Sequence, residues 1–330
     1  MKGDGRTAAT QSAAAPAPSR VRRRSSRRRF AQLAVVRVAL VAVLTCVLLG
    51  ADRGEPGAGR PSVPAEVGWP VRAAFYYPWY PESEHWATWY TPTLGKYDSS
   101  DRHVLATHVA QARYAGLDAF ISSYWGLDTP TARRLPVLLD VAGRQGFPIT
   151  VYYEPESLPT PPSRALLSQD FDSLYRLSAH PAWLRVEGKP VLFVYNIGRE
   201  ASCPAVSRLL AASRSRFYLN LKVFDGYRDC RDQPESWHQY VPARRFDQQG
   251  SDSATVSPGF FKFDETVPRL PRDLQRFEAD LRRQVASDAR WQLITSFNEW
   301  GEGTAVEPSL QWKSPSGYGT YLEAMRSVYY

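Results

Sequence analysis

Two glutamates three residues apart, Glu299 and Glu302, are the side chains of this sequence best suited to chemistry. They follow an apolar run at residues 291–297 that predicts a buried strand, so both lie where that strand ends. Two carboxylates facing one cavity can break a glycosidic bond, because one donates a proton while the other acts as base or nucleophile. The alternative is a polar loop whose acids only cap the next element. Trp300 and Gly301 between the acids favour the catalytic interpretation, since glycine permits close approach.

The elements that must position these acids alternate along the chain as short apolar runs and helix-like stretches, which is typical of a parallel sheet covered by helices. The predicted strands are 71–77, 117–124, 148–153, 190–195, 217–224 and 292–297, with weaker runs at 240–244 and 254–257. The predicted helices are 101–114, 131–144, 163–178, 204–213, 272–287 and 318–329.

This alternation predicts an α/β fold, a (β/α)8 TIM barrel formed by residues 71–330 as a single catalytic domain. A doubly wound open sheet is the alternative. The first predicted strand is not followed by the glycine-rich phosphate loop that many such sheets carry, which favours the barrel.

Polar and aromatic residues gather at the predicted strand ends, where barrels place their active sites. They are Tyr76 and Tyr77 after the first strand, Trp125 after the second, Glu154 after the third, and Asn298 and Trp300 beside the two glutamates. These aromatic residues could simply fill the core. A strand-end Trp next to glycine, as at Trp125, better fits a platform for sugar rings, whose apolar faces stack on aromatic faces.

The net charge of +8 comes from the N-terminal residues. Residues 1–30, a predicted cytoplasmic tail, hold nine Lys or Arg and one Asp, whereas from residue 71 onward 29 basic residues balance 29 acidic ones. A neutral domain disfavours a nucleic-acid partner.

An apolar segment at residues 33–50, interrupted by Arg37, follows the basic tail. As a helix, it would be about as long as a bilayer core is thick. We therefore predict a transmembrane signal anchor at residues 31–50, with the N-terminus in the cytoplasm. The alternative is a cleaved secretory signal, because residues 26–30 match the twin-arginine pattern. Residues 51–70, rich in Gly and Pro, are the predicted linker to an extracytoplasmic domain.

Cys203 and Cys230 are the two cysteines after the apolar segment. An extracytoplasmic location permits a disulfide between them, and two free thiols are the alternative.

Six motifs of the chain resemble, in order, those of glycoside hydrolase family 99, the endo-α-1,2-mannosidases and endo-α-1,2-mannanases. They are AFYYPWY at 74–80, HW at 85–86, PTLGKYDS at 92–99, GLDAFI at 116–121, YYEP at 152–155 and FNEWGEGT at 297–304, followed by EP at 307–308.

The resemblance implies a (β/α)8 barrel, no cofactor or metal, and cleavage with retention of configuration. In that family the sugar's own 2-hydroxyl attacks the anomeric carbon. Glu299 is then the base for that hydroxyl, and Glu302 is the acid for the leaving oxygen and later the base for water. Glu302 must stay protonated near neutral pH, which burial or the neighbouring Glu299 favours. The expected substrate contacts are Tyr76, Tyr77, Trp125, Glu154, Asn298 and Trp300, with Trp125 on the non-reducing side of the cleaved bond.

The chain departs from the family pattern at Gly301, where the family usually has His between the Trp and the second Glu. This change removes a polar side chain from the expected cleft and leaves the exact substrate open.

We therefore expect a monomeric, retaining, endo-acting α-1,2-mannosidase whose partner is an α-mannoside oligo- or polysaccharide. One alternative is a hydrolase of another α-linked glycan. Another is an extracytoplasmic carbohydrate-binding or polysaccharide-assembly protein with a barrel cleft but little turnover.

Overall fold

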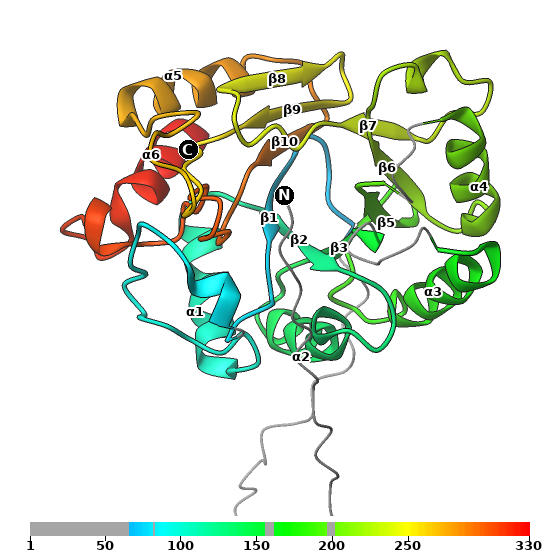
Figure 1. Ribbon diagram of the computed structural model, residues 1–330, viewed down its shortest axis with the longest axis horizontal. Helices are drawn as coiled ribbons and strands as arrows, with labels where there is room; N and C mark the ends of the chain where they lie inside the picture. Colours follow the sequence, from blue (N-terminus) through cyan, green and yellow to red (C-terminus); the bar gives the residue numbers. More distant parts are fainter. Residues whose placement is uncertain (1–65, 82, 156–161, 197–201) are drawn as a thin grey trace, which may run out of the picture. The chain divides into compact units, whose positions relative to one another are not determined.

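The computed structural model of the protein describes residues 66–81, 83–155, 162–196 and 202–330 (Figure 1). Its centre is a sheet with strand order β7-β6-β5-β3-β2-β1-β10-β9-β8, in which every neighbouring pair except β9–β8 is parallel. The parallel strands are β1 (Val71–Tyr76), β2 (Ala119–Tyr124), β3 (Ile149–Tyr153), β5 (Lys189–Val194), β6 (Tyr218–Lys222), β7 (Ser236–His238), β9 (Ser253–Val256) and β10 (Trp291–Ile294). The antiparallel additions are β4 (Arg185–Val186) on β5 and β8 (Phe246–Gln249) on β9.

The two ends of this strand order approach each other, so the sheet forms a nearly closed barrel. The Thr255 hydroxyl of β9 donates to the carbonyl of Gln239, just after β7, at 2.7 Å. The Thr295 hydroxyl after β10 donates to the carbonyl of Tyr240 at 2.6 Å. The predicted parallel sheet is confirmed, and the architecture is consistent with a (β/α)8 fold rather than an open sheet.

All six predicted helices are present, and they lie outside the strands (Figure 1). They are α1 (Arg102–Tyr114), α2 (Pro130–Arg144), α3 (Arg164–Leu177), α4 (Cys203–Ser213), α5 (Leu274–Val285) and α6 (Gly319–Tyr329). Four begin at a side chain that accepts a hydrogen bond from a backbone amide of the first turn: Asp101, Thr129, Ser163 and Asp273. Such caps satisfy amides that the helix itself leaves unpaired.

The second half of the barrel is less regular than the first. Between β6 and β7 the described chain has only the short 3-10 helix η3 (Tyr227–Asp229), and between β7 and β9 it has β8 in place of a helix. The weak strand predicted at 240–244 is wrong, because the strand is β7, which ends at His238 before a turn closed by Arg244 N–H donating to the Val241 carbonyl.

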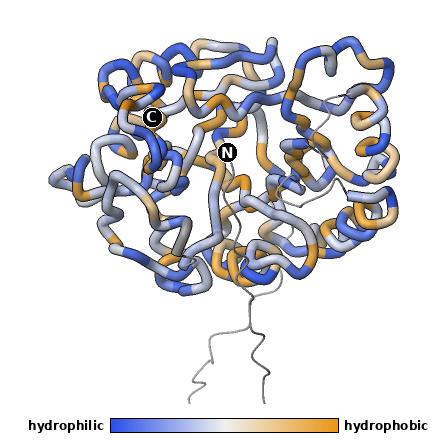
Figure 2. The backbone as a smooth tube through the Cα atoms, in the orientation of Figure 1, coloured by the Kyte–Doolittle hydropathy of each residue, from blue (hydrophilic) through white to orange (hydrophobic). Residues whose placement is uncertain are grey.

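Strand residues alternate between two apolar layers, as the two-residue period of a strand requires. In β1, Ala73 and Phe75 pack inside the barrel, whereas Ala74 and Tyr76 pack against the helices. Tyr77, the next residue, faces the barrel interior. Figure 2 shows apolar residues along the central strands, and apolar residues that alternate with hydrophilic ones along the surrounding helices.

The predicted cytoplasmic tail, membrane anchor and most of the linker, residues 1–65, lie outside the described residues. Among those that the structure does describe, no helix is both long and apolar enough to cross a membrane.

Candidate active site

A cavity of about 620 Å³ opens at the carboxyl ends of the parallel strands, a volume usual for ligand pockets. The end of each of the eight parallel strands, or the segment that follows it, contributes to the lining. The lining residues are Tyr77, Trp79, His85, Trp125, Glu154, Tyr195, Lys222, Gln239, Tyr240, Val241, Pro242, Lys262, Phe263, Glu299, Gly301 and Glu302.

Both glutamates face this cavity from one tight turn after β10, residues 298–302, which we call the glutamate turn. The Glu299 carboxylate folds back onto the turn's own backbone. Its Oε1 accepts a hydrogen bond from the Gly301 amide at 3.2 Å, and its Oε2 accepts one from the Glu302 amide at 2.5 Å. The Glu299 amide donates to the Ser296 hydroxyl at 2.8 Å. The position of Glu299 is therefore fixed by three hydrogen bonds within the segment.

Glu302 has a different environment, because Tyr240 is its hydrogen-bonding partner. The Tyr240 hydroxyl donates to Glu302 Oε2 at 3.2 Å. Burial, and the charges of Glu302 and Glu299, raise the pKa of Tyr240 well above its usual value, so the hydroxyl keeps its proton. Burial raises the pKa of Glu302 to about 7, against the opposing effects of the Tyr240 hydrogen bond and the charges of Lys262 and Arg269.

The two carboxyl groups titrate as a pair. Burial first, and then the charge of Glu302, raise the pKa of Glu299 well above its usual value as well. A charge on one of two interacting buried carboxyl groups disfavours a charge on the other. The two backbone amides that donate to Glu299 stabilise its charged form, and Glu302 accepts no backbone amide among the described residues. These hydrogen bonds favour the charge on Glu299 over a charge on Glu302.

One side of the cavity is an aromatic wall made of Tyr77, Trp79, His85 and Trp125. The Trp79 ring lies 4.4 Å from that of Tyr77, 4.5 Å from that of His85 and 5.4 Å from that of Trp125, between centroids. Such a surface can hold sugar rings by stacking.

Other lining residues of the cavity are polar. Glu154 accepts a hydrogen bond from the Ser123 hydroxyl at 2.5 Å, and the Lys222 ammonium lies 4.6 Å from the ring centre of Tyr195. Polar groups in such positions can orient hydroxyls of a bound sugar. In the part of the chain that the structure describes, no three His, Cys, Asp or Glu side chains lie close enough together to hold a metal ion.

Behind the glutamate turn lies a buried network formed by Tyr76, Tyr97, His108, Asn298, Trp300 and Glu307. Glu307 is its hub: Oε2 accepts from the Tyr97 hydroxyl at 2.8 Å and from Trp300 Nε1 at 3.1 Å, while Oε1 lies 3.2 Å from His108 Nε2. His108 Nδ1 lies 3.1 Å from the Tyr76 hydroxyl. The network thus ties the Trp300 side of the turn to helix α1 and strand β1.

Asn298 attaches the other end of the turn to β1. Its Oδ1 accepts from the Tyr77 amide at 2.7 Å, and its Nδ2 donates to the Tyr77 carbonyl at 3.0 Å. The Tyr80 hydroxyl donates to the Asn298 carbonyl at 2.9 Å and accepts from the Trp300 amide at 3.3 Å. Both residues that flank Glu299 are therefore fixed.

Five of the predicted site residues line the cavity: Tyr77, Trp125, Glu154, Glu299 and Glu302. The prediction that Tyr76, Asn298 and Trp300 contact substrate is corrected, because all three are fully buried behind the cavity. Tyr76 lies on the helix-facing side of β1, and the other two belong to the buried network. The chemical roles of the five lining residues stay predictions.

Several lining residues had no predicted role. Trp79 and His85 lie within the motifs at 74–80 and 85–86, close to Tyr77 in the sequence. Their place in these motifs could have indicated that they line the site. Tyr240 was hidden inside the wrongly predicted strand. Lys222 and Lys262 carried no signal that separates them from surface lysines.

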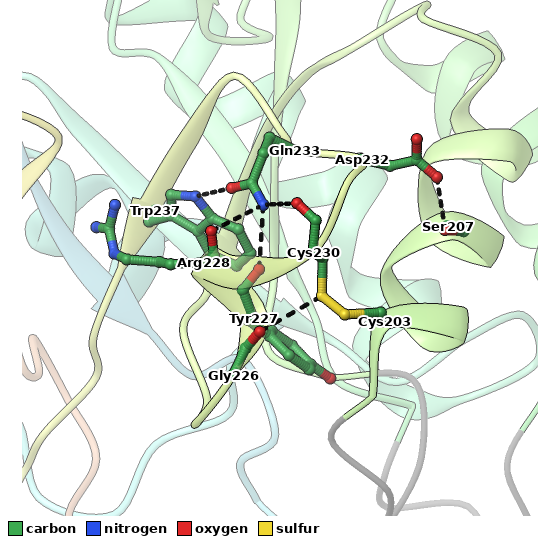
Figure 3. The surroundings of a disulfide bond; sticks show 9 residues. All are labelled: Cys203, Ser207, Gly226, Tyr227, Arg228, Cys230, Asp232, Gln233 and Trp237. Atoms are coloured by element: carbon green, nitrogen blue, oxygen red, sulfur yellow. Dashed lines mark hydrogen bonds between the residues drawn. A yellow bond between two sulfur atoms is a disulfide. The ribbon is translucent and has the colours of Figure 1, made fainter.

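Cys203 and Cys230 form a disulfide, with Cα atoms 5.3 Å apart (Figure 3). It joins the first residue of α4 to the segment after β6. Gln233 holds the same segment, since its Nε2 donates to the Cys230 carbonyl at 2.6 Å and its Oε1 accepts from Trp237 Nε1 at 3.1 Å. These contacts order the irregular connection between β6 and β7.

A barrel whose strand ends surround two buried carboxyl groups and an aromatic wall has the groups that glycoside hydrolysis requires. The chain matches the model of glycosyl hydrolase family 99 over residues 80–227. This match supports the predicted resemblance to family 99 over that segment, and with it a glycoside hydrolase. The matched segment ends before the glutamate turn, so the turn's assignment depends on the geometry above and on the motif at 297–304.

Solved structures share the fold. The GH99 endo-α-mannosidase from Bacteroides thetaiotaomicron in complex with bis-tris-propane is 20% identical, with a TM-score of 0.63 over 78% of this chain and 95% of that one. A glycoside hydrolase-like protein is 16% identical, with a TM-score of 0.62 over 83% of this chain and 97% of that one. At these identities the likeness shows a common fold.

Proposed function

We propose that this protein is a retaining, endo-acting α-mannosidase that cleaves α-1,2-mannosidic bonds in oligo- or polysaccharides. The observation that carries the proposal is the unequal pair in one cavity: Glu299 accepts hydrogen bonds from two backbone amides, and Glu302 accepts one from the Tyr240 hydroxyl. One is suited to be a base and the other an acid at neutral pH. The family match and the aromatic wall support a glycan as substrate.

In the first step Glu299 accepts the proton of the sugar's 2-hydroxyl, and the resulting oxygen attacks the anomeric carbon. The bond to the leaving oxygen breaks, and that oxygen takes the proton of Glu302. The products are a shortened glycan, a 1,2-anhydro sugar, a protonated Glu299 and an ionised Glu302. Oxygen 2 of the sugar thus serves as the nucleophile, and Glu299 forms no bond to carbon.

In the second step the Glu302 carboxylate takes a proton from water, whose oxygen attacks the anomeric carbon. The three-membered ring opens, and oxygen 2 recovers its proton from Glu299. Both glutamates return to their starting states. Two successive displacements at the same carbon give retention of configuration.

Incubation of the purified protein with α-1,2-linked mannans and glucosylated mannosides, followed by NMR of the first products, tests the proposal. We expect internal cleavage and an α-configured new reducing end. Cleavage with inversion contradicts the mechanism. Cleavage only of other α-linked glycans contradicts the substrate, and tight glycan binding without turnover favours a carbohydrate-binding protein instead.

We also infer that the catalytic domain works outside the cytoplasm as a membrane-anchored monomer, with a cleaved twin-arginine signal as the alternative. The basic residues before the apolar segment 33–50 support this orientation, and so does the disulfide, which oxidising compartments favour. Protease added to intact cells with an accessible surface should digest the domain. Full protection of the domain contradicts this location.

A further inference from the structure

An exposed aromatic surface lies beside the glutamate turn, at the mouth of the cavity. We call it the rim platform, and it consists of Trp89, Phe261 and Phe263. Trp89 is 51% exposed and Phe263 is 47% exposed. The rings of Trp89 and Phe261 are stacked, with centroids 5.0 Å apart and planes 10° from parallel. Large apolar side chains left this open next to a cavity commonly mark a contact surface for a ligand.

The rim platform is attached directly to the turn that carries the acids. The Phe261 amide donates to the Glu302 carbonyl at 2.9 Å, and the Phe263 amide donates to the Gly301 carbonyl at 3.2 Å. Gly303 permits this close approach, because it has a φ of +65° and a Cβ there would lie 2.6 Å from the Phe261 carbonyl oxygen. The platform therefore has a fixed position relative to Glu302.

The exposed part of Trp89 is apolar. Its only polar side-chain atom, Nε1, donates to the Lys262 carbonyl at 3.0 Å, and one face of its ring is covered by Phe261. The remaining face is available for stacking, which the apolar face of a sugar ring can provide. Lys262 and Phe263 also line the cavity, so the platform continues the cavity outward.

Gly301 leaves the space between the acids and the segment that leads to Trp89 without a side chain. A Cβ at this position would lie 3.3 Å from Glu299 Oε1 and 3.8 Å from the Ala87 carbonyl oxygen. Any larger side chain here has to extend between these two groups or crowd the carboxylate. The glycine thus keeps the cavity open toward the rim platform.

From these contacts we propose that the rim platform is a sugar-binding subsite for the leaving-group side of the glycan. The Phe261 amide donates to the backbone carbonyl of Glu302, the residue proposed to protonate the leaving oxygen, whereas Trp125 lies in the aromatic wall with Trp79 and His85. A glycan that crosses the acids from Trp125 then reaches Trp89 with its reducing-side sugars. This inference rests on the proposed function, and it adds a specificity determinant for the length and shape of the leaving group.

Kinetics of Trp89→Ala on two substrates test the proposal. One is an α-1,2-manno-oligosaccharide, and the other is a glycosyl fluoride with the same sugars on the non-reducing side, whose leaving group cannot reach Trp89. We expect kcat/KM on the oligosaccharide to fall about tenfold, mainly through KM, with less than about a twofold change on the fluoride. Trp89→Phe should recover most of the loss, since it restores an aromatic face.

Tyr175→Ala is the matched control. Tyr175 is 43% exposed and packs on Phe217 and Arg216, on helix α3 rather than at the cavity, so its loss should change neither substrate's kinetics. An equal loss on both substrates in Trp89→Ala, or no loss on the oligosaccharide, overturns the subsite.

A failure of the proposed function gives a different result, because the unsubstituted protein then cleaves neither substrate. Calorimetric binding of the same oligosaccharide decides the subsite in that case. Binding about tenfold weaker in Trp89→Ala than in the unsubstituted protein supports the rim platform. Equal binding by both proteins, or none by either, overturns it.

Discussion

The two sides of the glutamate turn differ in what their polar atoms contact. On the buried side, Asn298 and Trp300 make hydrogen bonds to protein groups and are fully shielded from solvent. On the cavity side, Glu299 and Glu302 bond to the protein through some of their oxygen atoms and face open space. Asn298 and Trp300 thus hold the turn, while Glu299 and Glu302 face the cavity. The comparison shows that a motif identified by sequence combines residues with two separate tasks.

The largest effect should come from Glu299→Gln on the cavity side. An amide cannot take the proton of the 2-hydroxyl, so turnover should fall on the order of 10²-fold or more, about 3 kcal/mol in barrier, for glycans and glycosyl fluorides alike. Initial rates on both substrates measure this. Rapid cleavage of a 2-deoxy substrate, or a glycosyl ester trapped on Glu299, would show that the carboxylate is itself the nucleophile.

The pH dependence should report the proton on Glu302. Because burial raises its pKa to about 7, kcat/KM for glycans should decline as the pH rises above about 7, approaching tenfold per pH unit. A raised pKa also favours the protonated folded state, so the free energy of unfolding should decrease as the pH rises from about 4.5 through 7. Urea titrations should show a smaller decrease in Glu302→Gln. An unchanged pH dependence in that variant contradicts the assignment.

A smaller effect should come from Glu307→Gln on the buried side. Glu307 touches no cavity space, but it accepts hydrogen bonds from Tyr97 and Trp300 and lies beside His108. Replacing one acceptor oxygen by an amide donor should lower the free energy of unfolding by about 1–3 kcal/mol. We also expect kcat to fall about tenfold with KM nearly unchanged, since the turn loses its fixed position.

Glu323→Gln on α6 is the control for Glu307→Gln, since it removes a carboxylate that neither lines the cavity nor belongs to the buried network, on a helix outside the strands. It should alter neither stability nor kinetics. A Glu307→Gln protein that loses stability but keeps full kcat would show that the network supports the fold without positioning the acids.

The smallest effect on catalysis should come from removing the disulfide, because neither of its cysteines belongs to the glutamate turn. The Cys203→Ser, Cys230→Ser double variant should lower the free energy of unfolding by about 2–4 kcal/mol, since it frees a constraint on the unfolded chain. Activity of the folded protein should change little. Urea denaturation followed by fluorescence measures the first effect, and an unchanged midpoint would contradict it.

Much of the fold could be predicted from sequence because its local signals agree. The helices α1, α2, α3 and α5 have a capping side chain and an apolar face, and most strands are continuous apolar runs. The strand β7 has three residues, too few for such a signal, so the apolar residues just after it were taken for the strand.

The side chains of β1 alternate between the barrel interior and the helices, and this alternation shows why the site was predicted only in part. Phe75, Tyr76 and Tyr77 are all aromatic, so their chemistry does not say which ones face the barrel. A shift of one residue exchanges the two faces of a strand. In the glutamate turn, Asn298 and Trp300 look suited to bind sugars. Their burial involves contacts with Tyr97 and Glu307, and the motifs that contain these two residues do not reveal such contacts.

The proposed roles of Glu299 as base and Glu302 as acid are tested most directly by Glu302→Gln, assayed on a natural glycan and on a glycosyl fluoride. Fluoride leaves without a proton, so the account predicts a loss on the order of 10²-fold or more for the glycan and a much smaller loss for the fluoride. Equal losses on the two substrates would contradict the assignment of Glu302 as the acid.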